Sequence, residues 1–145
     1  MSMIVRAGEG TSVPWGPAGQ IRVLGGADST DGSFSIVETL EQPGSAAPLH
    51  VHHREAEAFY VVDGAIELTC GNERLTAHAG DFVYAPKGVP HRYSVVGERP
   101  ARVLLMFSRP GFESFFVEGS SADGHEAMQQ ILAKHDLEVL EPFGH

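Results

Sequence analysis

LHVHHREAEAFYVVDGAIEL, from Leu49 to Leu68, is the most informative stretch of this sequence. Three of the eight histidines of the chain and two glutamates lie between His50 and Glu57, and an apolar run interrupted by Asp-Gly follows them. One interpretation is a solvent-exposed loop that is rich in titratable groups. The other is half of a metal site, and the rest of the sequence is needed to decide between them.

The composition is that of an ordinary globular domain. The chain has 145 residues, of which 42% are hydrophobic and 20% are charged, so we expect one domain with a substantial core. The 17 glycines and 9 prolines are typical of a turn-rich β protein. Ten Lys and Arg against 19 Asp and Glu give a formal charge of −9, which argues against nucleic acids and membranes as partners.

Several features predict a cytoplasmic protein. The N-terminal residues MSMIVRAGEG lack the cationic start and apolar run of a signal peptide, and no run of about eighteen apolar residues predicts a membrane span. Cys70 is the single cysteine, so an intrachain disulfide is impossible, which fits a reducing compartment. Because Cys70 shares a strand face with Ile66 and Leu68, we expect a small apolar filler rather than a reactive thiol.

Short strand-like segments separated by turn residues occupy most of the chain. The candidate strands are QIRVL (20–24), FSIVETL (34–40), EAFYVV (57–62), AIELTC (65–70), RLTA (74–77), DFVYA (81–85), HRYSVV (91–96) and RVLLMF (102–107). Asp63-Gly64 and Gly71-Asn72 each predict a tight hairpin between the segments beside them. Many short strands with helices only at the end favour an antiparallel barrel or sandwich.

The last part of the chain has a helical pattern. GFESFFVEG (111–119) predicts one or two helical turns, and SADGHEAMQQILAKHDLEVL (121–140) predicts an amphipathic helix because its apolar residues recur at helical spacing. Asp123 and Glu126 resemble a capping box at the start of that helix. We expect this helical segment, about residues 111–136, to cover the barrel rather than to bind a partner.

The histidine cluster has the spacing of metal ligands. His50 and His52 lie two residues apart, so on a strand both imidazoles point to the same face. Glu57 joins them if the four intervening residues, HREA, form a hairpin loop that returns Glu57 beside His52. In that case His53 points away, and Glu55 lies at an exposed loop tip. Glu57 also opens an apolar strand, where an ionised carboxylate costs several kcal/mol unless a cation or hydrogen-bond donors satisfy it.

A further candidate ligand lies in GDFVYAPKGVPHRYSVV (80–96). The prolines and Gly88 predict a turn, and His91 begins the next strand with Tyr93 on the same face. Three histidines and one carboxylate leave coordination positions open, so a site of this kind would be reactive rather than structural.

Together, these residues resemble the motifs of the cupin superfamily. The first motif is Gly, five residues, His-x-His, three or four residues, Glu, six residues and Gly; here it is met by Gly44, His50, His52, Glu57 and Gly64. The second is Gly, five residues, Pro-x-Gly, two residues, His, three residues and Asn; here it is met by Gly80, Pro86, Gly88 and His91, with Val95 in place of the asparagine. The resemblance implies an all-β fold, a jelly-roll barrel of six to eight strands at about residues 20–108, with a short C-terminal helical segment. It also implies a single cupin domain over residues 1–145, and often a homodimer.

The resemblance also implies the ligands and the cofactor. His50, His52, Glu57 and His91 would hold one divalent transition metal ion, which could be Fe, Mn, Ni, Cu, Co or Zn because imidazole suits all of them. His53 would lie at the surface or behind the ligands. The other histidines are expected to be exposed: His78, His125, His135 and His145.

The function that the resemblance implies is that of an enzyme acting on a small organic molecule. Oxygen-dependent cleavage or oxidation, as in quercetinase-like dioxygenases, is the leading reaction, with Glu57 both as ligand and as general base for a substrate hydroxyl. Tyr93 and Phe59 are candidates for substrate contact, although core packing explains Phe59 equally well. The alternatives are isomerase, cyclase or lyase chemistry with the metal as a Lewis acid, and a non-catalytic module that binds a small molecule.

Overall fold

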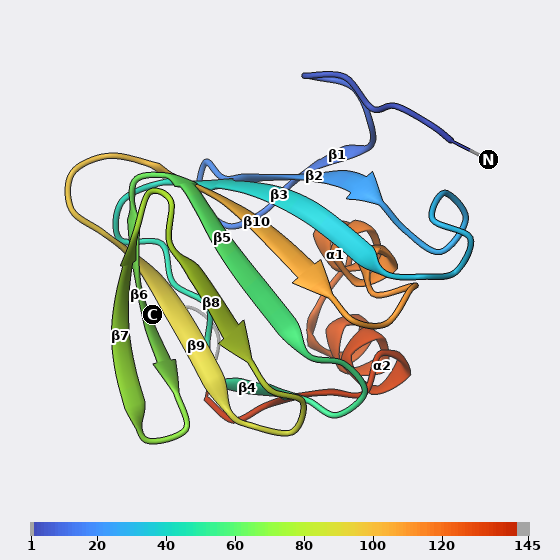
Figure 1. The fold of residues 1–145 in the computed structure, drawn as a ribbon. Helices are drawn as coiled ribbons and strands as arrows, with labels where there is room; N and C mark the ends of the chain where they lie inside the picture. The colour runs from blue at the N-terminus through green and yellow to red at the C-terminus, as the bar shows by residue number, and fades with distance from the viewer. Residues whose placement is uncertain (1, 142–145) are drawn as a thin grey trace.

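The computed structural model describes residues 2–141 and shows two antiparallel β-sheets that face each other, with two helices beside them (Figure 1). Sheet A has six strands in the order β1 (Ser12–Pro14), β2 (Gln20–Gly25), β3 (Ser35–Glu41), β10 (Ala101–Phe107), β5 (Glu57–Asp63) and β8 (Phe82–Ala85). Sheet B has five strands in the order β11 (Leu137–Val139), β4 (His50–His52), β9 (His91–Val96), β6 (Ala65–Cys70) and β7 (Glu73–His78). The predicted all-β class is confirmed, and the sheets contain more strands than the expected six to eight because β1, β4 and β11, of three residues each, were not among the candidate strands.

The core lies between the facing sides of the two sheets. Every second residue of β3 and β10 is buried, as the period of two along a strand requires. Val37 and Val103 from sheet A meet Ile66 and Leu68 from sheet B, and all four are completely buried. Burying one such side chain stabilises the fold by about 1.5–3 kcal/mol. Cys70 packs partly buried against this core, and burial raises the pKa of its thiol, which fits the predicted filler role.

The two predicted hairpins have different outcomes. Cys70 pairs with Glu73 across β6 and β7, so Gly71-Asn72 is a two-residue hairpin loop, as predicted. The prediction for Asp63-Gly64 is wrong, because β5 belongs to sheet A and β6 to sheet B. Gly64, with φ of 79°, is instead the corner at which the chain passes from one sheet to the other.

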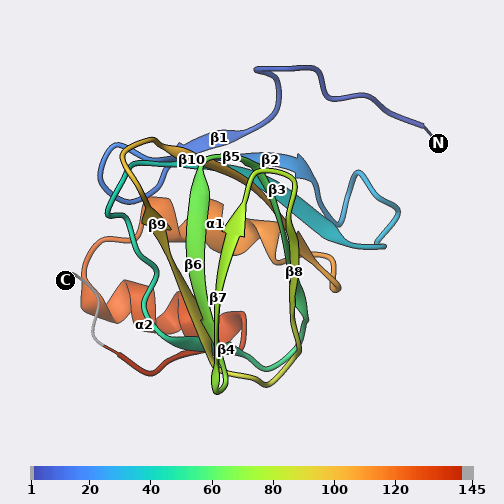
Figure 2. The same ribbon diagram turned by 60° about the vertical axis from the view of Figure 1, so that its left-hand side comes forward.

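Two helices close the side of the molecule where β1 and β11 form the sheet edges. α1 (Glu113–Ser120) contacts β1, β2 and β3, whereas α2 (His125–Lys134) contacts β11, so the pair bridges the two sheets (Figure 2). Phe115, Phe116 and Leu132 are their buried side chains. The predicted C-terminal helical segment is therefore confirmed. None of the helices within residues 2–141 is long and apolar enough to cross a membrane.

The helix predicted over residues 121–140 is shorter than expected. It ends at Lys134, and residues 137–139 form β11, which pairs with β4. Strand pairing prevails here because it satisfies the backbone of β4 on its free side and buries Leu137. The predicted capping box is also wrong, since Gly124 precedes the helix and no side chain caps its first turn.

Candidate metal centre

Strands from both sheets bring the four predicted ligands together. His50 pairs with His91 in antiparallel register between β4 and β9 of sheet B, and His52 lies two residues further along β4. Glu57 begins β5 in sheet A. The predicted hairpin between His52 and Glu57 is therefore wrong: the four intervening residues cross from sheet B to sheet A. Glu57 still reaches the histidines, because it approaches them from the facing sheet.

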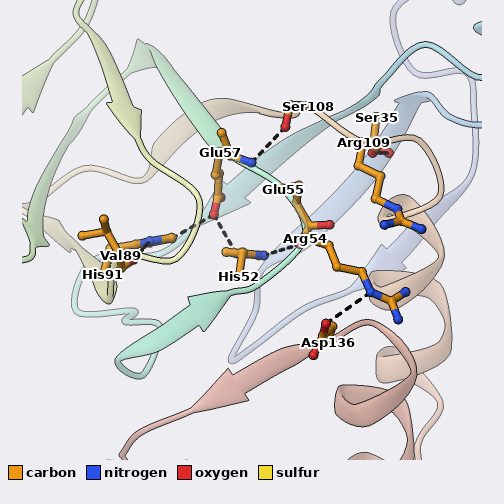
Figure 3. Close-up of polar contacts among 11 residues, drawn as sticks. Ser35, His52, Arg54, Glu55, Glu57, Val89, His91, Ser108, Arg109 and Asp136 are labelled. Carbon is orange, nitrogen blue, oxygen red and sulfur yellow. Dashed lines mark hydrogen bonds and ion pairs between the residues drawn. The ribbon is translucent and has the colours of Figure 1, made fainter.

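The spacing of the ligand atoms fits a single ion. His50, His52, Glu57 and His91 each offer one ligand atom, and these atoms all lie within 4.8 Å of one another. Glu57 Oε1 is 3.0 Å from His52 Nε2 and 3.0 Å from His91 Nε2, with the carboxylate between the two rings (Figure 3). Two ligand atoms about 2.1 Å from a metal and at right angles to each other lie about 3.0 Å apart, so the observed contacts match one coordination sphere.

Each imidazole is held at its Nδ1 atom by an acceptor of the protein. Nδ1 lies 2.7 Å from the Pro48 carbonyl oxygen in His50, 2.9 Å from Glu55 Oε1 in His52 and 3.3 Å from the Val89 carbonyl oxygen in His91. Histidines that bind metals almost always donate their second N–H in this way, which fixes the ring and leaves the other nitrogen for the metal. The donor set is therefore three Nε2 atoms and one carboxylate.

The electrostatics of the cluster suit a cation. Burial, with the neighbouring His91 and His52, lowers the pKa of His50 to about 4, so its Nε2 lone pair is free at neutral pH. Burial acts in the same direction on His52, but hydrogen bonds to Glu55 and Glu57 outweigh it and raise the pKa of that imidazole to about 9. Burial opposes ionisation of Glu57, yet hydrogen bonds from His52 and His91 hold its pKa well below the usual range. Glu57 is thus an anion in a buried site, where a divalent ion could replace the proton of the His52 imidazole.

The structure corrects the expectation for Glu55. Its side chain was predicted at an exposed loop tip, but it is only 2% exposed and reaches His52 on the side of the ring away from Glu57 (Figure 3). The crossover between sheets explains this position, because the connecting residues pass across the end of the barrel instead of projecting from a hairpin. His53 does point away, as predicted, and its Nε2 lies 2.9 Å from Glu138 Oε1 at the surface.

The other histidines within residues 2–141 lie outside the cluster. His78 and His125 are exposed, as predicted, and His145 lies outside the described residues. The prediction for His135 is wrong: its side chain is largely buried, with Nε2 2.7 Å from Glu118 Oε1, because the loop after α2 packs it against the aromatic rings of α1.

A cavity of about 1210 Å³ adjoins the ligands, three of which line it: His50, His52 and Glu57. Another part of its wall is aromatic and is formed by Trp15, Phe107, Phe112, Phe115 and Phe116. Phe112 joins the two parts, because its ring centroid lies 4.9 Å from that of His52. This volume is sufficient for a small organic molecule.

The two predicted substrate contacts differ in position. Tyr93 lines the cavity, and its buried hydroxyl donates a hydrogen bond to Glu41 Oε2 at 2.5 Å. Phe59 is completely buried behind this wall, where it packs against Tyr93 and His91. Its position is explained by core packing. Glu41 was not among the candidate residues, although extending the alternation of FSIVETL by one residue would have placed it on the inner face of β3.

Comparison with known proteins agrees with this arrangement. Residues 37–107 match the protein family described as "Cupin domain". Quercetin 2,3-dioxygenase of Bacillus subtilis is 36% identical over 99 residues, which are 68% of this chain and 29% of that protein. A mutant of oxalate decarboxylase OxdC from the same organism has 27% identity and a TM-score of 0.62, with 70% of this chain and 28% of that chain covered.

One further solved structure supports the fold alone. KdgF from Halomonas sp. superposes with a TM-score of 0.67 at 19% identity, covering 78% of this chain and 99% of that chain. By contrast, this chain spans less than a third of the dioxygenase and of the decarboxylase. The motifs, the two facing sheets and these similarities lead to one conclusion: the chain belongs to the cupin superfamily.

Proposed function

We propose that this cupin is a metal-dependent enzyme that uses O₂ to oxidise or cleave a small organic molecule. The observation that carries the proposal is the convergence of three imidazoles and Glu57 at the wall of a large cavity, with every imidazole held at Nδ1. The 36% identity with quercetin 2,3-dioxygenase supports this reaction type over others. A bound redox-active divalent metal would supply Lewis acidity and a place for O₂ beside the substrate.

The protein residues would divide the remaining work. His50, His52 and His91 would hold the ion in fixed positions, since hydrogen bonds lock each ring. Glu57 would be both ligand and general base, taking the proton of a substrate hydroxyl onto its carboxylate. Its position at the cavity wall, within hydrogen-bond distance of two imidazoles, would stabilise the carboxylate before that proton transfer.

The cavity would select and orient the substrate. The aromatic wall would offer flat apolar surfaces to the substrate, whereas Tyr93 and Glu41 form a polar pair on the same cavity. A small molecule with an apolar ring or chain and at least one hydroxyl group matches this combination.

Oxygen consumption tests the proposal directly. Protein purified without oxygen would be loaded separately with Fe(II), Mn(II), Ni(II), Cu(II), Co(II) or Zn(II) and mixed with flavonols, catechols and diketones. We expect O₂ uptake with at least one redox-active metal and one substrate class, and none with the His52→Ala variant. His53→Ala is the matched control, because this neighbouring histidine points to the surface. No uptake with any combination would contradict the proposal.

A lyase reaction is the second candidate, favoured by the 27% identity with oxalate decarboxylase. In that case the metal-loaded protein would release CO₂ from oxalate or a related carboxylate with no net O₂ consumption. Measuring both gases in the same vessel separates this reaction from the oxidative one.

A further inference from the structure

Glu55 is a buried carboxylate that the cupin motifs do not account for. Its Oε1 atom lies 2.9 Å from His52 Nδ1, while Glu57 Oε1 lies 3.0 Å from Nε2 of the same ring. The imidazole of His52 is thus held between two carboxylates, only one of which has the position of a ligand (Figure 3).

The loop from His53 to Ala56 is tied down on both sides of Glu55. On one side, the His53 amide donates to the Asp136 carbonyl oxygen at 3.2 Å, and Arg54 Nε lies 3.3 Å from Asp136 Oδ2. On the other side, the Ala56 amide donates to Ser108 Oγ at 2.9 Å. These contacts with two separate parts of the chain fix the backbone so that Glu55 points inward.

The contact makes His52 different from the other two histidines. His50 and His91 face neutral backbone carbonyls at Nδ1, whereas His52 faces a carboxylate. A hydrogen bond to an ionised acceptor is roughly twice as strong as one to a neutral group, and it raises the basicity of the imidazole as a ligand. The three imidazoles are therefore unequal donors.

We infer that Glu55 is a positioning residue of the metal centre: it holds the His52 ring with Nε2 toward the ion and makes this histidine the strongest of the three nitrogen ligands. The inference rests on metal binding in the proposed function, and it adds a residue to the site that the motifs do not include.

Zinc affinity and the state of the His52 ring test this role. The dissociation constant for Zn(II) would be measured by chelator competition in the wild type, Glu55→Gln and Glu55→Ala. We expect zinc to bind about 10- to 100-fold more weakly in the variants. The loss should be larger for Glu55→Ala than for Glu55→Gln, because Gln keeps a neutral acceptor of the same shape. Nitrogen-15 NMR of the zinc-loaded protein should show a proton on Nδ1 of His52 in the wild type and altered shifts for this ring in both variants.

Glu138→Gln is the matched control, since it makes the same change to a contact of the same length, 2.9 Å, at the exposed His53. It should change zinc affinity by less than about twofold. Unchanged affinity and unchanged His52 shifts in both Glu55 variants would overturn the inference alone, even if their thermal stability fell. A wild-type protein that takes up no zinc would overturn it together with the proposed metal centre.

Discussion

The Tyr93 hydroxyl donates a hydrogen bond of 2.5 Å to Glu41 Oε2, and both side chains are buried at the wall of the cavity that adjoins the candidate metal ligands. Burial raises the pKa of Glu41 above its ordinary value of 4.5; the charge of Glu57 acts in the same direction, and the hydrogen bond from Tyr93 opposes it. The ionised form of Glu41 is therefore less favourable in the folded protein than in the unfolded chain.

This difference predicts how stability depends on pH. The folded protein keeps the proton of Glu41 to higher pH than the unfolded chain does, so the protonated group favours folding. This stabilising contribution to the free energy of unfolding is largest below about pH 4.5, and it is lost as the pH rises through the pKa of Glu41 in the folded protein. Glu41→Gln cannot ionise, so its free energy of unfolding relative to the wild type should increase from about pH 4 to pH 8. Urea denaturation at several pH values measures this difference.

The exposed Glu98 provides the control for the pH experiment. The difference between Glu98→Gln and the wild type should stay within about 0.5 kcal/mol, because a substitution of an exposed side chain usually changes the free energy of unfolding by no more than that. A Glu41→Gln difference that stays flat or decreases with pH would show that the ionised carboxylate is satisfied in the folded protein.

The ligand set predicts that His52→Ala will lose its metal and keep its fold. One of four ligands is removed, and the strands that carry the other three keep their pairing in both sheets. The metal content measured after loading and desalting should fall from about one ion per chain in the wild type to less than about a tenth of that value in the variant. Circular dichroism should still show the β-sheet spectrum. Full metal occupancy in the variant would show that the ligand assignment is wrong.

Phe112 predicts a link between the helical cover and the site. Its ring packs against His52, Phe107 and Phe116, and it is almost completely buried. Phe112→Ala should reduce the free energy of unfolding by about 3–5 kcal/mol, since the cavity left behind cannot fully close. Val117→Ala, on the exposed side of α1, should cost less than about 1 kcal/mol. Similar costs for the two variants would show that α1 is not packed on the barrel as described.

The cluster of four candidate ligands could be predicted from the sequence because their spacing is local. His50, His52, Glu57 and His91 each lie at fixed distances from a glycine or proline of the two motifs. The same applies to strands such as HRYSVV, where alternation of apolar residues defines the inner face. These patterns involve only a few consecutive residues, so they can be recognised in the sequence without knowing the order of the strands in the sheets.

The errors concern contacts between distant parts of the chain. Asp63-Gly64 has the composition of a hairpin turn, but its flanking strands do not pair with each other. Instead, β5 pairs with β10 and β6 pairs with β9. Glu55 is polar and lies in a loop, and only the crossover between the sheets buries it. Residues 137–139 continue a helical pattern, yet they form a strand because they pair with the free edge of β4. In each case the tertiary partner overrides the local preference.

Gly64 predicts the cost of disturbing the corner between the sheets. With φ of 79° it adopts a backbone conformation that side chains disfavour, and a Cβ atom there would lie 2.5 Å from the Pro100 carbonyl oxygen and 2.8 Å from Ala101 Cα. Gly80 has a similar φ of 92° but nothing within 4 Å of its Cβ position. Gly80→Ala should therefore cost only the backbone strain, about 1–2 kcal/mol, and Gly64→Ala should cost clearly more because backbone atoms must also move. Equal shifts of the urea midpoint in the two variants would contradict this prediction. They would mean that the backbone at Pro100 and Ala101 can move away from the added Cβ atom at no cost in stability.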